Sequence, residues 1–319
     1  VAMKELGKVT QLIVSLEQGQ RITPDEWEQS TSLPYSSLGL VEVDKVLCWP
    51  QGLDLISQQG IAQSLLVEGH SFKLHVHKCI GSTNSLLVEE AQSKNINDQV
   101  HIAEFQYQGR GRRGRQWVSP YARNLAVSLG RASGRDLDDL SGLSLVAGLA
   151  LAEALESAGV QNLSLKWPND IWVEHKKLAG ILVELVKSES GVQVIIGFGI
   201  NVDLTADEIL SIDQPVTDVR RCGSLASRNT LVALCLNSLT QYLDLFENKR
   251  FKPFVSAFNM LHTLHGQQCN LIAAGDAPDR SVKVLGVSET GALIVATNVG
   301  VEHVHGGEVS IRLAESKNN

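Results

Sequence analysis

The chain has 319 residues, of which 43% are hydrophobic and 20% charged, an ordinary composition for a globular protein of two or three domains. No apolar run reaches the roughly 18 residues of a membrane span and no secretory signal pattern is present, so we expect a cytosolic protein without a membrane partner. The net charge of −7 argues against wholesale nucleic-acid binding, and five scattered cysteines without C-x-x-C spacing predict reduced thiols, not disulfides or a zinc site.

The first region, residues 1–65, contains two or three helix-like stretches. One covers residues 9–18, and another opens at Thr23. Thr23 can cap that helix, Pro24 suits its first turn, and Glu26 completes a capping box. We therefore expect a small helical domain at the N-terminal end.

The second region, residues 70–265, alternates predicted strands and helices, the pattern of a mixed α/β domain. Helices are expected at residues 85–93, 140–158 and 228–248, and strands at residues 72–77, 100–106, 124–129, 163–167, 171–174, 178–186 and 192–200. Ser82, Thr83 and Asn84 can cap the first helix and Ser227 the third. The middle helix is apolar on most sides, so we expect it to lie at the centre of the domain.

The third region, residues 266–319, changes to short strands separated by Gly-containing turns, which predicts a small β-barrel. Its strands are expected at residues 269–272, 282–287, 292–296 and 309–313. His303 and His305 share one face of a strand, and we assign them to packing or to the surface and not to a metal.

Residues 109–115 read Gly-Arg-Gly-Arg-Arg-Gly-Arg. Glycine lets the backbone approach a ligand, and arginine offers planar charged donors that match carboxylate or phosphate oxygens. The run lies between two apolar strands, and Trp117 follows closely enough to cover a planar ligand, so we interpret it as an anion-binding loop. A solvated charged loop and an RNA-binding Gly/Arg segment stay open as alternatives, although no wider basic surface supports the second.

Two further segments are weaker signals. Lys166 precedes a turn made rigid by Pro168, where its charge could meet a phosphate or carboxylate; an exposed lysine beside a buried tryptophan is the simpler interpretation. Residues 197–201 end a strand with two glycines and Asn201, whose amide could reach a sugar or phosphate. The sequence offers no Ser-His-Asp arrangement and no metal-ligand cluster, which favours adenylyl or phosphoryl transfer by charge stabilisation.

Six segments in this order and spacing resemble those of bacterial biotin–protein ligases. They are Ser82-Thr83-Asn84, Glu104-x-Gln106, Gly109-Arg110-Gly111-Arg112-Arg113-Gly114-Arg115-x-Trp117, Lys166-Trp167-Pro168-Asn169-Asp170, Lys177-Leu178-Ala179-Gly180-Ile181-Leu182-Val183-Glu184 and Gly197-x-Gly199-Ile200-Asn201. The resemblance covers residues 70–319, including Gly306-Gly307-Glu308-Val309-Ser310. It implies an α+β fold with a winged-helix-like N-terminal domain, a mixed α/β catalytic domain of the biotin/lipoate ligase type and an SH3-like C-terminal β-barrel.

The resemblance implies an ATP-dependent, AMP-forming biotin–[acetyl-CoA-carboxylase] ligase. Biotin and ATP, with Mg²⁺, would give biotinyl-5′-AMP and pyrophosphate, and a lysine of a biotin carboxyl carrier protein would then take the biotinyl group. Lys166 is implied to stabilise charge in both steps and Arg112 to retain the adenylate. The implied biotin-binding residues are Ser82, Thr83, Asn84, Gln106, Arg110, Gly111, Arg112, Lys166 and Gly197. The implied adenylate-binding residues are Arg113, Arg115, Trp117, Lys177 and Asn201, and no residue is assigned to the metal.

Some of these ligases also repress the biotin operon through an N-terminal winged helix-turn-helix. Here Lys45 is the only Lys or Arg between Ile22 and Phe72, against seven acidic residues, and Pro34 falls where a recognition helix would begin. We therefore predict a degenerate domain that does not bind DNA. The alternative is a bifunctional ligase and biotin operon repressor that binds DNA through residues 1–65.

A lipoate ligase or octanoyltransferase on the same fold is another alternative, which the intact arginine loop disfavours because those relatives lack it. Relatives also dimerise through the catalytic sheet, so a homodimer stays an option for this chain. Tyr107 stands where relatives often have a small or polar residue, which leaves the lining of the biotin pocket open near it.

Overall fold

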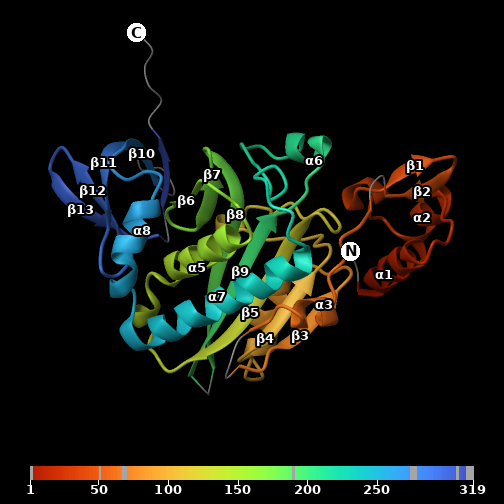
Figure 1. Ribbon diagram of the computed structural model, residues 1–319, viewed down its shortest axis with the longest axis horizontal. Helices are drawn as coiled ribbons and strands as arrows, with labels where there is room; N and C mark the ends of the chain where they lie inside the picture. Colours follow the sequence, from red (N-terminus) through yellow and green to blue (C-terminus); the bar gives the residue numbers. More distant parts are fainter. Residues whose placement is uncertain are drawn as a thin grey trace, which may run out of the picture.

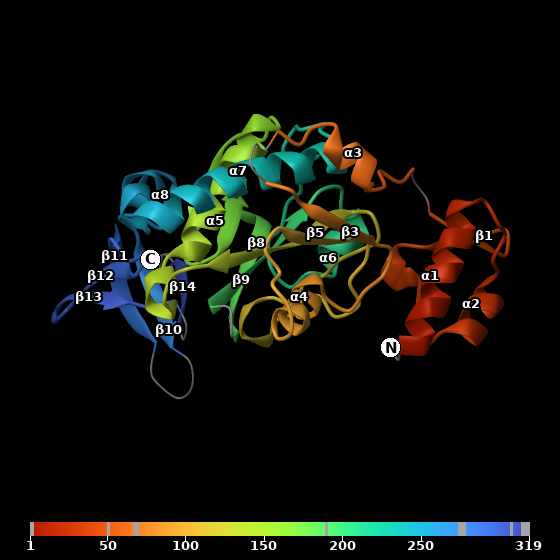
Figure 2. The same ribbon diagram turned by 90° about the horizontal axis from the view of Figure 1, so that it is seen from below.

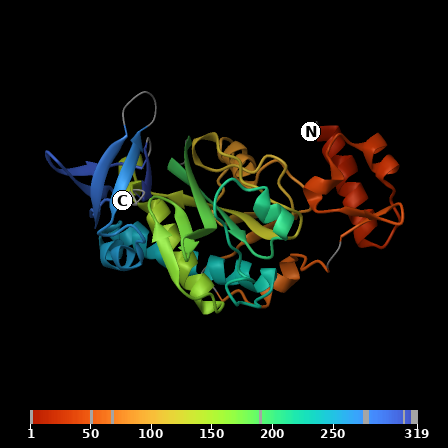
Figure 3. The ribbon, with the colours of Figure 1, turned by 90° about the horizontal axis from the view of Figure 1, so that it is seen from above.

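The computed structural model describes residues 3–49, 52–66, 70–188, 191–273, 279–306 and 309–313. A helical N-terminal part, a central sheet covered by helices and a C-terminal β sheet follow one another along the long axis of the molecule (Figure 1). The N-terminal part and the C-terminal sheet lie at opposite ends of the central sheet (Figure 3). The predicted α+β fold is confirmed.

The N-terminal part is built from two helices, a 3-10 turn and a hairpin. These are α1 (Met3–Glu17), α2 (Pro24–Ser30), η1 (Tyr35–Leu38), β1 (Val41–Val43) and β2 (Val46–Cys48). Thr23 caps α2 and forms the predicted capping box with Glu26. Pro34 immediately precedes η1, so a single 3-10 turn stands where a recognition helix was considered.

The N-terminal part shares its core with the central part. Phe105 and Tyr121 lie in the same buried cluster as the apolar side chains of α1 and α2. Trp49 stacks on Tyr121 with 5.1 Å between ring centroids, and Lys78 pairs with Glu17 at 2.9 Å. The two parts are therefore packed together and not merely tethered.

A mixed sheet of order β3-β4-β5-β9-β8-β7-β6 forms the middle of the molecule. Its strands are β3 (Lys73–His77), β4 (Gln99–Ala103), β5 (Asn124–Ser133), β6 (Leu163–Lys166), β7 (Asp170–Val173), β8 (Lys176–Ser188) and β9 (Gly191–Asn201). β3 and β4 are parallel, and the other neighbouring pairs are antiparallel.

Helices cover both faces of this sheet. Helices α5 (Leu143–Ser157) and α7 (Arg228–Lys249) pack against each other on one face, and α4 (Thr83–Ala91) covers the opposite face (Figure 2). Ser82 and Ser227 cap α4 and α7 as predicted. The shorter elements are α3 (Gln58–Ala62), η2 (Arg112–Gly114), η3 (Leu137–Leu140), α6 (Ala206–Leu210), η4 (Lys252–Phe254) and α8 (Val255–Leu261).

Helix α5 is the predicted central helix. It begins three residues later than expected because Gly142, with φ of 84°, separates it from η3. The segment Leu137–Ser157 is long and apolar enough to cross a membrane, contrary to the sequence expectation, but 67% of its apolar window is buried inside the protein. We therefore interpret it as the core helix of a globular domain.

The C-terminal part is an antiparallel sheet of order β13-β12-β11-β10-β14. Its strands are β10 (Gln268–Ala273), β11 (Arg280–Val287), β12 (Leu293–Thr297), β13 (Gly300–Val304) and β14 (Val309–Leu313). The predicted small β domain is confirmed, although β13 was missing from the predicted strands, and the ladders of the described residues do not join β13 to β14. His303 and His305 are exposed, and residues 307 and 308 of the Gly306–Ser310 motif lie outside the described residues. All five cysteines are free, as predicted.

Candidate active site

A cavity of about 480 Å³ opens between the arginine loop, the strands β7–β9 and the C-terminal strand β14. This volume lies in the range of small-molecule sites. It is lined by Ser82, Thr83, Asn84, Gln106, Arg110, Gly111, Arg112, Arg113, Arg115, Trp117, Lys166, Lys177 and Gly197. Of the predicted site residues only Asn201 is not among the lining ones. It is buried, and its amide donates to the Thr217 carbonyl at 3.0 Å.

One end of the cavity is polar and uncharged. The Thr83 backbone N–H and hydroxyl donate to Gln106 Oε1 at 2.8 and 3.2 Å. The Ser128 hydroxyl lies 2.7 Å from Thr83 Oγ1 and 2.6 Å from Asn84 Oδ1, and its one proton is donated to either of these acceptors. These side chains and Ser82 are buried, so the donors and acceptors are held in place before any ligand arrives. This end suits a neutral ligand group with both N–H and C=O functions.

Gly197 makes room for this polar end. A Cβ at position 197 would overlap the Asn84 amide and lie 2.6 Å from Asn84 Cγ. Asn84 cannot move aside easily, because its Nδ2 also donates to Glu184 Oε2 at 2.9 Å and to the Leu182 carbonyl at 3.2 Å. The glycine therefore decides where the amide of Asn84 lies.

Trp117 forms a flat wall of the cavity against strands β8 and β9. A Cβ at Gly199 would lie 2.7 Å from its Nε1, and a Cβ at Gly180 would lie 3.4 Å from its Cζ3. The Lys177 ammonium lies 5.8 Å from the ring centroid. Two strand glycines thus let the indole lie directly on the sheet.

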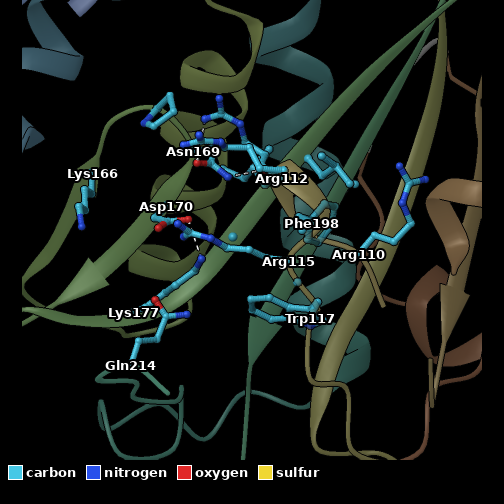
Figure 4. A pocket seen from close by; sticks show the side chains of 18 of the residues that line it. Arg110, Arg112, Arg115, Trp117, Lys166, Asn169, Asp170, Lys177, Phe198 and Gln214 are labelled. Carbon is cyan, nitrogen blue, oxygen red and sulfur yellow. Dashed lines mark hydrogen bonds and ion pairs between the residues drawn. The ribbon is translucent and has the colours of Figure 1, made fainter. Parts of the chain in front are cut away.

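The arginine loop spans the cavity from the central sheet to the C-terminal part. Arg110 pairs with Glu184 of β8 at 2.8 Å, and Arg113 donates to Ser310 of β14 at 3.0 Å. Between them Arg112 donates to Asn169 Oδ1 at 3.3 Å. Figure 4 shows the labelled arginines on the loop side of the cavity and the two lysines on strands of the sheet.

Lys166 and Lys177 supply the remaining charge. The Lys166 ammonium lies 4.2 Å from the centroid of the Trp172 ring, and Lys177 pairs with Asp170 at 2.8 Å. Burial lowers the pKa of Lys166, and nearby Lys177 and Arg312 lower it further, while Asp170 opposes the shift.

Arg112 is desolvated in the same way. Burial lowers its pKa, with Arg113 and Arg115 adding to the effect and Asp170 opposing it. Crowded, desolvated cations of this kind favour an anion among them, since it compensates both the burial and the mutual repulsion.

Several lining residues were not predicted. Asp170 and Asn169 lie inside the recognised Lys166 motif, so the motif could have indicated them. Arg312 comes from β14, and Ser128 from the middle of β5, and neither carries a local signal. Gln214 belongs to the loop between α6 and α7, together with Asp213 and Pro215. Tyr107 is not among the lining residues; its hydroxyl lies 3.3 Å from the position of a Cβ on Gly81.

Comparison with known proteins places two family models on the chain. The biotin/lipoate A/B protein ligase family matches residues 76–201, and the biotin protein ligase C terminal domain matches residues 264–312. The bifunctional ligase/repressor BirA of Escherichia coli is 34% identical over 83% of this chain and 81% of its own length. The biotin--[acetyl-CoA-carboxylase] ligase of Mycobacterium tuberculosis is 32% identical over 58% of this chain and 69% of its own. The solved biotin protein ligase of Aquifex aeolicus in complex with biotin and ATP superposes with a TM-score of 0.64 at 28% identity, over 76% of this chain and 99% of its own.

Proposed function

The chain belongs to the biotin protein ligases of the biotin/lipoate A/B protein ligase family, and we propose how its cavity activates biotin with ATP and transfers it to a lysine. One observation carries the proposal: an uncharged, pre-ordered polar pocket and a cluster of desolvated cations line a single cavity under the arginine loop. A ligand with a neutral ureido head and an anionic tail fits these two ends.

The head of biotin is held by the polar end. Thr83 and Asn84 face the ureido group, and Gln106 and Ser128 bond to them from behind. Ser82 caps α4, the helix that carries Thr83 and Asn84. The chain of biotin then runs past Gly197 toward Lys166. Because the polar groups are already bonded to one another, little ordering is needed when biotin enters.

In the first step the biotin carboxylate oxygen attacks the α-phosphorus of ATP, and the bond to pyrophosphate breaks. Lys166 and Arg112 lie where both anions must approach, and they offset the repulsion between carboxylate and phosphate. Arg113 and Arg115 bind the phosphates, Trp117 stacks on the adenine, and Lys177 lies beside that ring. Asn201 acts indirectly: its amide donates to the carbonyl of Thr217, in the loop that also carries Gln214.

In the second step the neutral ε-amine of an acceptor lysine attacks the acyl carbon of biotinyl-5′-AMP. The tetrahedral intermediate collapses, AMP leaves with the bonding electron pair, and the amine gives up a proton. Lys166 stabilises the oxyanion and the departing phosphate. Between the two steps Arg110, Gly111 and Arg112 close over the adenylate, which would otherwise dissociate or be hydrolysed.

Mg²⁺ fits this site as a companion of ATP and not as a protein-held ion. In the described part of the chain no group of three or more His, Cys, Asp or Glu could hold a metal. The cavity does include the carboxylates of Asp170 and Asp213, and Mg²⁺ is commonly bound by one or two carboxylates together with substrate phosphates. When bound there it would neutralise phosphate charge.

We propose a biotin carboxyl carrier protein as the acceptor, since two relatives are described as biotin--[acetyl-CoA-carboxylase] ligases. We place the reaction in the cytosol, because all five cysteines are free thiols. A homodimer through the central sheet is part of the same proposal. So are three domains, at residues 1–65, 70–265 and 266–319.

Repression of transcription is not part of the proposal, although the relative from Escherichia coli is described as a bifunctional ligase/repressor. A single 3-10 turn follows Pro34, and Lys45 is the one cation in residues 23–49. Such a surface lacks the phosphate contacts that DNA binding requires. Tight, salt-sensitive binding to a biotin-operon duplex in a mobility-shift assay would contradict this.

The ligase activity is tested by exchange of labelled pyrophosphate into ATP with biotin, lipoate or octanoate as the acid. We expect exchange with biotin alone, followed by labelling of a carrier domain. Exchange with lipoate or octanoate and none with biotin would reassign the substrate.

A further inference from the structure

A fully buried ion pair lies outside the cavity. Arg228, the first residue of α7, and Glu104, just beyond the end of β4, are both inaccessible to solvent, with 2.6 Å between Arg228 Nη1 and Glu104 Oε2. Neither residue lines the cavity or takes part in the reaction proposed above. Two buried charges are costly to desolvate, so what they hold in place is of interest.

The guanidinium of Arg228 binds three separate segments. It donates to Glu104 at one side of the arginine loop, and Nε and Nη2 donate to the Asn124 carbonyl at the other side, at 2.9 and 2.6 Å. Nη1 also donates to the Asp54 carbonyl at 2.8 Å. The other Glu104 oxygen accepts from the Ile56 backbone N–H at 2.7 Å. Segment 54–56, which precedes α3, is thus bonded to both Arg228 and Glu104.

These attachment points are the two feet of the arginine loop. Everything from residue 105 to residue 123 lies between them, including the whole cationic run. The first foot is two residues from Gln106, which anchors Thr83. At the second foot the Asn124 amide donates to the Val118 carbonyl at 3.1 Å, directly after Trp117. Both feet therefore connect by short, bonded paths to the walls of the cavity.

We propose that Arg228 is a positioning residue that fixes both feet of the arginine loop, so that opening is confined to its glycine-rich tip and the adenylate is retained between the two steps. The proposal rests on the ligase function proposed above. A planar guanidinium is needed because it donates in several directions at once, which an ammonium on a flexible stem cannot reproduce. Without it this tie is lost while the backbone bond from the Ala122 N–H to the Glu104 carbonyl at 3.1 Å and the β4–β5 pairing remain, so the feet and the walls carrying Gln106 and Trp117 are held less rigidly.

The test uses the full chain and compares Arg228→Gln with Arg131→Gln. Arg131 is a matched control: a largely buried arginine nearer the other end of β5, bonded to Asp98 at 2.9 Å and to Asp244 of α7 at 2.7 Å, away from the loop. Each enzyme is loaded with labelled biotin and ATP, freed of excess ligand, and followed for loss of bound biotinyl-5′-AMP. Labelling of serum albumin lysines and pyrophosphate exchange per folded protein are measured in parallel.

We expect Arg228→Gln to release adenylate about tenfold faster or more and to label albumin, with exchange less affected, since each lost bond has the charged guanidinium as its donor. Arg131→Gln should lower Tm comparably and leave release unchanged. Equal release from the two variants, or release from Arg228→Gln at the native rate, overturns the proposal.

If Arg228→Gln does not fold, Glu104→Gln decides, because it keeps the shape and the acceptor for Ile56 while removing the charge. It should release adenylate faster than the native enzyme, and an unchanged rate overturns the proposal. Absence of biotin-dependent exchange in the native enzyme would instead overturn the proposed function itself.

Discussion

Two glycines on one strand lie at the two ends of the cavity. Adding a methyl group to one of them should weaken the binding of biotin, and adding it to the other should weaken the binding of ATP. Gly197 faces Asn84 and Gly199 faces Trp117, two residues apart on β9. A Cβ at 197 would lie 2.6 Å from Asn84 Cγ, and a Cβ at 199 would lie 2.7 Å from Trp117 Nε1. Neither glycine has a positive φ, so alanine is compatible with the backbone and only the side-chain overlap matters.

The size of the effect follows from what must move. In Gly197→Ala the Asn84 amide has to leave hydrogen bonds to Ser128, Leu182 and Glu184. Overpacking of this kind costs about 1–3 kcal/mol, which corresponds to a KM for biotin raised roughly 5- to 150-fold. In Gly199→Ala the indole must lift from the sheet, so the same cost falls on the KM for ATP.

The assay is pyrophosphate exchange with each substrate varied in turn, and Gly148→Ala on α5 is the control. A Cβ at Gly148 would meet Ile181 and Leu165 at an ordinary 3.6 Å, so this variant should keep both KM values and gain about 0.4–1 kcal/mol of stability. If Gly197→Ala and Gly199→Ala raise both KM values to the same extent, the division of the cavity into a biotin end and an adenine end is wrong.

The remaining predictions concern Lys166, Arg112 and His101. Lys166→Ala should slow both half-reactions by about 10²- to 10³-fold in single-turnover experiments, whereas Lys176→Ala, at an exposed lysine of β8, should not. Because burial lowers the pKa of Lys166 from 10.5, the rate should decline on the alkaline side at a pH below 10.5, and Lys166→Arg should move that decline upward; an unchanged profile argues against a role for its charge. Arg112→Gly should leave adenylation largely intact but release the adenylate, measured as biotinylation of unrelated lysines. Burial lowers the pKa of His101 to about 4, although Glu90 opposes the shift. Between pH 6.5 and about 4 the unfolded chain therefore binds more protons than the folded protein, so Tm should decrease as the pH is lowered through this range. His101→Gln should make Tm depend less on pH there.

Patterns readable along the chain predicted most of the helices and strands and, with the family resemblance, most of the cavity residues. Helix starts at Thr23, Ser82 and Ser227 follow from local capping chemistry, which acts within three or four residues and is therefore readable along the chain. The arginine loop could be interpreted as an anion-binding loop because guanidinium groups match carboxylate and phosphate oxygens and glycines let the backbone approach a ligand, while the residues alone left a solvated loop and RNA binding open. Its family resemblance then supplied the residues on the strands.

Contacts between residues far apart in the sequence became known from the three-dimensional arrangement of the elements. Gly197 is required because Asn84, more than a hundred residues earlier, lies against it, and Asn201 turned out to face Thr217 and not the cavity. Arg312 reaches Lys166 from another sheet. Nothing near Arg228 or Glu104 in the sequence indicates their pairing, since buried charges find partners by the packing of whole elements and not by spacing along the chain.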